Sequence, residues 1–220
     1  MINEEFKQIW SPWIGARYEN RDLRLMLIGE SHYSVDKNRN FDDDCYQNFL
    51  NSTNTTIDII KRLETGENWR IFSNTYKALF GDNQFVISDF WSKVGFYNLI
   101  QRPMKLLSER PNQNDFKNYL KVAIKMIENL QIKPTHLIFL GNSSERYFNS
   151  LINESDQFVL LEDNEEKIGR YWAFHKVIKS NNNIINVFFI KHPSSYFSWK
   201  KWNSYLNDIE PNFLKLKDSN

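Results

Sequence analysis

Short apolar runs that stop at a turn residue predict the strands of this chain. Four runs have this form, and they cover residues 23–28, 95–100, 136–140 and 184–190. The first stops at Gly29, the third at Gly141 and the last shortly before Pro193. Each run is too short for a typical helix and ends where glycine or proline interrupts regular structure, so each indicates a buried strand.

Amphipathic segments lie between these runs and predict helices. In residues 116–130, apolar side chains recur every three or four positions, with lysine and glutamate on the opposite face. Residues 143–152 and 198–206 also indicate helices, and each begins with a serine that could serve as an N-cap. Buried strands separated by helices favour an α/β fold in which a parallel sheet is covered on both faces.

The residues that follow the predicted strands are rich in chemical groups. They include a carboxylate and an imidazole in GESHY, an amide in FYNLIQRP, hydroxyls in LGNSS and a second imidazole in KHPSSYFSW. Open parallel sheets bind ligands beyond the carboxyl ends of their strands. We therefore expect the functional site at one edge of the sheet, in residues 30–33, 98–102, 142–144 and 192–197.

Composition indicates one folded domain over residues 1–220. The chain is 41% hydrophobic and 25% charged, which is enough apolar material for a core of its own. Its single cysteine, Cys45, excludes an intramolecular disulfide and an iron–sulfur cluster held by several thiolates of one chain. No apolar stretch is long enough for a membrane span or a secretion signal, so we expect a cytoplasmic protein.

The net charge favours no ligand class, and the motifs argue against several. The net charge of +1 gives no overall attraction to nucleic acid or to anionic membranes. The chain has no glycine-rich dinucleotide motif and no phosphate-loop lysine, and Ser31 lacks the flanking glycines of a hydrolase nucleophile. His136 and His175 have no cysteine or carboxylate partner at ligand spacing, and residues 42–44 predict a short acidic loop. We therefore expect neither a metal nor a cofactor.

The order and the residue types of the four motifs resemble those of the uracil-DNA glycosylase superfamily. The first motif of that family is a Gly-Gln-Asp-Pro-Tyr or Gly-Glu-Ala-Pro-Gly turn, where this chain has GESHY, and its last is a His-Pro-Ser loop, present at residues 192–194. The similarity extends over residues 23–206. It implies a three-layer α/β/α sandwich around a four-stranded parallel sheet, and hydrolysis of the N-glycosidic bond of a base flipped out of DNA.

This resemblance implies catalytic roles for three residues. Glu30 matches the carboxylate that positions water in one branch of the family, whereas Ser31 stands where the other branch has a catalytic aspartate. Asn98 matches the asparagine that reads the pyrimidine through its amide. His192 matches the histidine that hydrogen-bonds the departing base and stabilises the charge on its O2 atom. His32 replaces the proline of the family turn.

The resemblance also implies contacts to the base and to DNA. Tyr33 matches a tyrosine that crowds the C5 edge of the base, and either Phe41 or Tyr46 would stack on the base. Either Tyr196 or Phe197 would enter the duplex as a wedge. Three serines match residues that bind backbone phosphates, and three lysines supply positive charge near them. These expected DNA contacts are Ser73, Ser143, Ser194, Lys191, Lys200 and Lys201.

Two functions remain open from the sequence. The first is a monomeric, monofunctional DNA glycosylase that removes uracil or a modified pyrimidine, in repair or in defence against phage DNA. The second is a glycosylase-like protein that binds a base, a nucleotide or DNA without cleavage. Ser31, His32 and the near-neutral charge keep this alternative open. Release of a base distinguishes the two.

For Trp202, which follows Tyr196 and Phe197 at helical spacing, we expect packing rather than DNA contact.

Overall fold

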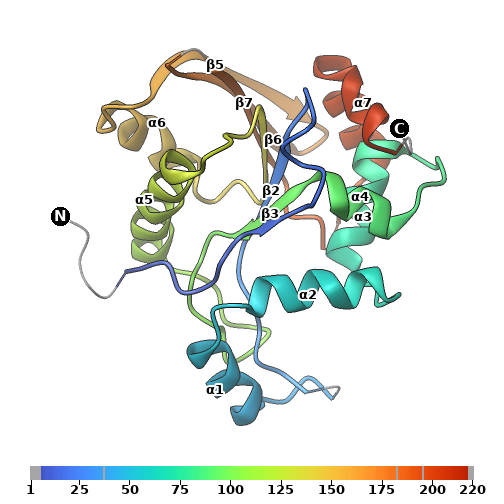
Figure 1. Cartoon of the computed structure of the whole chain (residues 1–220), viewed down its shortest axis with the longest axis vertical. Coiled ribbons are helices and arrows are strands. Elements are labelled where there is room, and N and C mark those ends of the chain that lie inside the picture. Colours follow the sequence, from blue (N-terminus) through green and yellow to red (C-terminus); the bar gives the residue numbers. More distant parts are fainter. Residues whose placement is uncertain (1–5, 37, 182, 195, 218–220) are drawn as a thin grey trace.

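The strands of the chain form one mixed sheet. The computed structural model describes residues 6–36, 38–181, 183–194 and 196–217, and in this part seven strands pair in the order β1-β3-β2-β4-β7-β6-β5 (Figure 1). The strands are β1 (Trp13–Ile14), β2 (Leu25–Gly29), β3 (Gly95–Asn98), β4 (His136–Leu140), β5 (Val159–Ile168), β6 (Tyr171–Ser180) and β7 (Asn183–Ile190).

The centre of the sheet is parallel. β2 pairs in parallel with β3 and with β4, and β4 pairs in parallel with β7. Every residue of β2, β3 and β4 is buried, as expected for strands covered on both faces. These four strands coincide with the four apolar runs of the sequence, and the predicted α/β class is confirmed.

The expectation of a four-stranded sheet is wrong, because three antiparallel strands extend the parallel centre. β1 joins the edge at β3, and the hairpin of β5 and β6 joins the other side at β7. β5 is exposed along nearly its whole length and carries four acidic residues between Glu162 and Glu166. It therefore lacks the alternation of apolar and polar residues that marks a strand in sequence.

Helices pack on both faces of the sheet (Figure 1). Phe188 and Phe189 are neighbours in β7, so their side chains point to opposite faces and belong to two different apolar cores. The core that contains Phe189 includes α5 (Gln113–Asn129) and α6 (Glu145–Asn153). The core that contains Phe188 includes α2 (Thr55–Glu64), α3 (Arg70–Phe80), α4 (Ile87–Lys93), α7 (Trp199–Ile209) and the 3₁₀ helix η1 (Pro211–Lys217).

Three of these helices, α5, α6 and α7, lie where the sequence predicts them. α5 begins at a capping box, in which the Asn112 side chain accepts a hydrogen bond from the Asp115 main chain and the Asp115 carboxylate accepts one from the Asn112 main chain. The serine N-cap of α6 is Ser144, one residue later than expected. Trp202 is buried in α7, as expected.

Residues 42–44 form a helix start, so the predicted acidic loop is wrong. Asp42 is the N-cap of α1 (Asp43–Asn51), and its carboxylate accepts a hydrogen bond of 2.9 Å from the Cys45 main chain. Asp43 and Asp44 occupy the first turn, where negative charge is favoured by the helix dipole.

Candidate functional site at the carboxyl edge of the sheet

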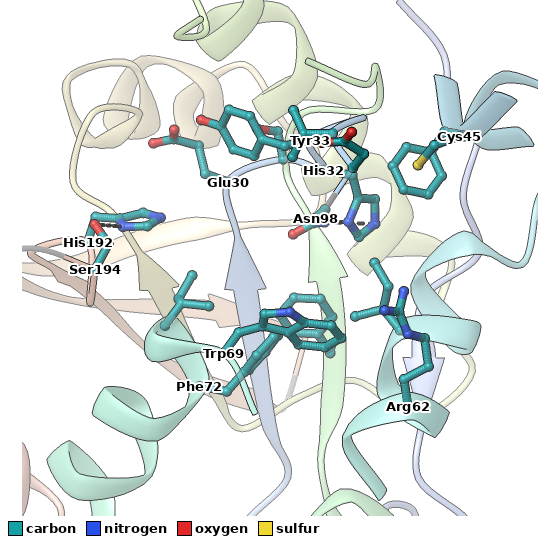
Figure 2. A pocket seen from close by; sticks show the side chains of 17 residues that line it. Glu30, His32, Tyr33, Cys45, Arg62, Trp69, Phe72, Asn98, His192 and Ser194 are labelled. Carbon is teal, nitrogen blue, oxygen red and sulfur yellow. Dashed lines mark hydrogen bonds between the residues drawn. The ribbon is translucent and has the colours of Figure 1, made fainter. Parts of the chain in front are cut away.

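A cavity of about 630 Å³ opens at the carboxyl ends of the parallel strands (Figure 2). Four polar residues of its lining come from the strand ends: Glu30 follows β2, Asn98 ends β3, and His192 and Ser194 follow β7. Most of the remaining wall is apolar and comes from α1, α2, α3 and β3, with Phe49, Ile59, Trp69, Ile71, Phe72 and Phe96. A concave, mostly apolar space with a few convergent polar groups is typical of a ligand site.

Strand register explains why residues so distant in sequence meet here. Gly29 of β2 pairs with Asn98 of β3, and Leu140 of β4 pairs with Ile190 of β7. All four strands run in the same direction, so the residues that follow them emerge at one level along one edge. This edge is the place at which the sequence predicts a site.

Gly141, directly after β4, lies between the two titratable residues of this edge. A β-carbon at this position would lie 3.6 Å from Glu30 Oε2 and 3.9 Å from His192 Cδ2. The backbone at Gly141 has a φ of 152°, an angle that residues with a side chain rarely adopt. Both distances are ordinary van der Waals contacts, so the backbone conformation, and not the available space, favours glycine here.

Glu30 is largely buried at the mouth of the strands. Its main-chain oxygen accepts a hydrogen bond of 2.8 Å from the Ile100 N–H, which fixes the start of the loop after β2. Burial raises the pKa of the Glu30 carboxyl, and the positive charge of Arg110 lowers it in part. Arg110 is itself anchored, because its Nη1 donates to the Tyr33 hydroxyl at 2.9 Å.

His192 is held as a neutral imidazole. Burial lowers its pKa to about 4, and the positive charges of Lys191 and Arg110 act in the same direction. Its Nδ1 lies 2.9 Å from the Ser194 hydroxyl. When that hydroxyl donates to Nδ1, the hydrogen of the neutral ring is on Nε2, and the ring points into the cavity (Figure 2). His192 can then donate to a ligand.

The Asn98 amide is oriented by His32, which is buried beneath it. Asn98 Nδ2 lies 3.0 Å and 2.9 Å from the two ring nitrogens of His32. Burial lowers the pKa of His32 to about 3, so this ring is neutral and can accept a hydrogen bond from the amide. The His32 ring packs edge-on against Trp10, with 4.6 Å between centroids. As a result, Asn98 Oδ1 points away from His32 and toward the side of Glu30 and His192 (Figure 2).

Tyr33 lies in the lining of the cavity, at the side of Glu30. A parallel bridge to Met104 holds the loop in which it lies, and the Met104 N–H donates to the His32 main chain at 2.8 Å. Burial and the nearby Glu30 carboxylate raise the pKa of the Tyr33 phenol.

Among the described residues, the lining does not include Phe41 or Tyr46. These rings pack against each other, with 5.7 Å between centroids, and the Lys105 ammonium lies 5.0 Å from the Tyr46 ring. Their sequence distance from Gly29 suggested a stacking role, but the start of α1 carries them away from the cavity. Besides Tyr33, the phenylalanine and tryptophan rings that line it are Phe49, Trp69, Phe72 and Phe96.

The expected phosphate-binding serines are spread over different surfaces. Ser194 lines the cavity, and Ser143 borders a small hollow beside Glu30 and Gly141. Ser73 lies on α3, where its hydroxyl bonds to the Asn68 side chain and to the Trp69 main-chain oxygen. It lines a separate surface hollow, and the cavity does not include it.

The loop after β7 separates its two candidate wedge residues. Tyr196 is 81% exposed, with a positive φ of 54°. Phe197 is half-buried and stacks on Trp202, with 5.7 Å between centroids and 6° between ring planes. Lys191 and Lys200 each lie over an aromatic ring, 4.5 Å from the Tyr171 centroid and 5.6 Å from the Trp199 centroid respectively.

Sequence reasoning missed Arg62, Trp69 and Arg110. The Arg62 guanidinium lies 5.1 Å from the Trp69 ring centroid at the far side of the cavity from His192, and it pairs with Glu67 at 2.7 Å. These residues come from helices and loops without a recognisable motif, so no signal in one sequence could have identified them.

In the part of the chain that the structure describes, no group of three or more His, Cys, Asp or Glu side chains is arranged to hold a metal ion. No helix in this part has the length and apolar character needed to cross a bilayer. No protein-family model matches this chain, and no curated protein matches it in sequence.

Proposed function

We propose that this protein is a monofunctional DNA glycosylase, which hydrolyses the N-glycosidic bond of a pyrimidine flipped out of DNA. One observation carries the proposal: Glu30, Asn98 and His192, the residues matched by the motif resemblance, border a single cavity at the carboxyl edge of the sheet. The four central parallel strands with helices on both faces would then correspond to the α/β/α sandwich of the family.

The three residues have complementary roles in this reaction. Cleavage breaks the bond between C1′ and the base, and the electron pair goes to the base, so the sugar becomes cationic and the base anionic. Glu30 would stabilise the cationic sugar and orient the water that adds to C1′, taking one proton from it. His192 Nε2–H would donate to O2 of the anionic base, which then takes up a proton from solvent. Asn98 Oδ1 would accept from an N–H group of the base edge.

The size of the cavity bears on the choice of base. Spaces of about 300 to 1,000 Å³ hold drug-sized ligands, and a bare pyrimidine ring fills only a small part of 630 Å³. The apolar wall beyond Asn98 leaves room for a substituent on the ring, so we favour a modified pyrimidine over plain uracil as the substrate.

The protein would act on DNA as a cytoplasmic monomer without metal or cofactor. Its role, in repair or in defence against phage DNA, would follow from the base it removes.

Alkali cleavage of labelled oligonucleotides tests this proposal. Substrates would carry uracil, hypoxanthine or 5-substituted cytosines, and phage DNA with natural modifications would be included. We expect abasic sites that disappear with Glu30→Gln and fall about 100- to 1,000-fold in rate with His192→Ala, the usual cost of losing one donor to a developing anion. Glu19→Gln, which changes an exposed carboxylate that does not line the cavity, is the matched control and should leave the rate unchanged.

Intact strands with every substrate would contradict the enzymatic proposal. If a gel shift then showed retained DNA binding, the second function, a glycosylase-like protein that binds DNA without cleavage, would replace the first.

A further inference from the structure

The turn of the β5–β6 hairpin lies at the same edge of the sheet as the cavity. β6 runs antiparallel to β7, with Phe174 paired to Phe189, so the start of β6 lies beside the end of β7. The contacts agree, because Lys191 lies over the Tyr171 ring and the Asn142 side chain donates to the Trp172 main-chain oxygen at 3.3 Å. The hairpin therefore extends one wall of the site past His192.

Cations and aromatic rings alternate on this wall. Arg170 lies between two tyrosines, with its guanidinium carbon 5.0 Å from the Tyr171 centroid and 5.3 Å from the Tyr196 centroid. Its Nε also donates to the Tyr171 hydroxyl at 2.8 Å. The Lys191 ammonium lies 4.5 Å from the Tyr171 ring. We refer to Arg170, Tyr171, Lys191 and Tyr196 as the rim platform.

The charge of the hairpin changes sign along its length. Arg170 and Lys191 are at the turn end, and a β-carbon at Gly169 would lie 3.4 Å from the Lys201 ammonium. The acidic residues Glu162, Asp163, Glu165 and Glu166 lie further along β5, away from the turn. A polyanion is therefore attracted to the turn and repelled from the strand, although the net charge of the chain is only +1.

We propose that the rim platform binds unpaired DNA next to the flipped nucleotide, so that the protein prefers single-stranded to duplex DNA. Arginine and lysine attract phosphates, and exposed aromatic rings stack on bases whose faces are not covered by neighbours. Tyr196, which is 81% exposed, offers such a surface. Bases in a duplex are stacked on both faces and cannot lie flat on these rings. The choice of DNA as the polymer rests on the proposed function.

Fluorescence anisotropy with a labelled oligonucleotide tests the platform without requiring catalysis. The protein would be titrated with unmodified single-stranded DNA and with the same sequence as a duplex, at several salt concentrations. We expect tighter binding of the single strand, and a loss of at least about fivefold in affinity with Arg170→Ala and with Tyr196→Ala, the lower end of what stacking on one ring contributes. Arg170→Ala should also lower the slope of log affinity against log salt by about one.

Lys179→Ala is the matched control. It removes an exposed cation of β6, the strand that begins directly after Arg170, but at the opposite end of that strand. It should change neither the affinity nor the slope of log affinity against log salt. Wild-type affinity in the Arg170→Ala and Tyr196→Ala variants, an equal loss with Lys179→Ala, or tighter binding of the duplex would each overturn the platform. Failure of the proposed function has a different signature, because a protein that releases no base can still lose single-strand affinity in the platform variants.

Discussion

Burial acts on Glu30 and His192 in opposite directions because their charged forms carry opposite signs. A carboxylate loses its charge more readily when it is desolvated, so the pKa of Glu30 rises, whereas the pKa of His192 falls to about 4. The proposed reaction needs a charged carboxylate and a neutral imidazole donor. The same desolvation therefore favours the required form of His192 and disfavours that of Glu30, and Arg110 partly offsets the second effect.

The pH dependence of base release should reflect this environment of Glu30. We expect activity to fall as the pH is lowered through the pKa of Glu30, at a higher pH than an ordinary glutamate would give. Arg110→Gln removes the charge that lowers this pKa, so the acid side of the profile should move to higher pH. Rates measured across a pH series on one substrate check this.

The control for this series is Arg146→Gln, an exposed residue of α6 that is not among the charges acting on Glu30. An acid side that stays in place in the Arg110 variant would show that Glu30 is not the titrating group.

At the scale of elements, the pairing of β2 with β3 determines where the Asn98 amide lies. Gly29 and Asn98 face each other in the register, and a β-carbon at Gly29 would collide with Asn98 Oδ1 and lie 2.9 Å from the Phe96 ring. Gly95 lies at the other end of the same pair, where an added β-carbon would meet the flexible end of Met26 at 2.9 Å. The two glycines therefore differ in what a methyl group would displace.

Gly29→Ala should impair base release far more than Gly95→Ala. The added methyl group would displace the amide from the side of the cavity, and a misplacement of about 1 Å at a reacting centre can cost about 100-fold in rate. Steady-state rates and thermal melting of both variants check this. Equal loss of activity in the two variants would contradict a positioning role for the Gly29–Asn98 contact.

At the scale of the whole molecule, buried histidines link folding to pH. His32, His136 and His192 all have pKa values lowered chiefly by burial. His32 is the extreme case, at about 3, because it lies beneath the site between Trp10 and Phe49. Its position joins the N-terminal segment, α1 and β3 around one ring.

We expect acid to unfold this protein through these histidines. Below a pH of about 6.5, the unfolded chain protonates His32 and the folded chain does not, so the free energy of unfolding falls as the pH falls toward about 3. The contribution of His32 is about 1.4 kcal/mol for each pH unit in this window. Urea unfolding of wild type and His32→Gln at a series of pH values measures it, and an identical pH dependence in the two proteins would contradict it.

The sequence alone determined the central strands and the edge at which to look for a site. Residues 23–28 and 136–140 are apolar runs closed by turn signals, residues 116–130 have clear amphipathic spacing, and two further helices begin at a serine that indicates an N-cap. Such patterns are local, because burial on two faces or on one stripe must be encoded in neighbouring residues. The rule for parallel sheets then places Glu30, Asn98 and His192 at one edge without knowledge of any contact.

Tertiary structure decided what surrounds these residues. β5 is polar and exposed, so only its pairing with β6 makes it a strand. The pairing of β6 with β7 then brings Arg170 to Tyr196. The exposure of Tyr196, the stacking of Phe197 on Trp202 and the position of Phe41 away from the cavity depend on partners distant in sequence. Exposure, pKa and side-chain orientation are properties of a neighbourhood in space, and one chain read in order does not specify that neighbourhood until it is folded.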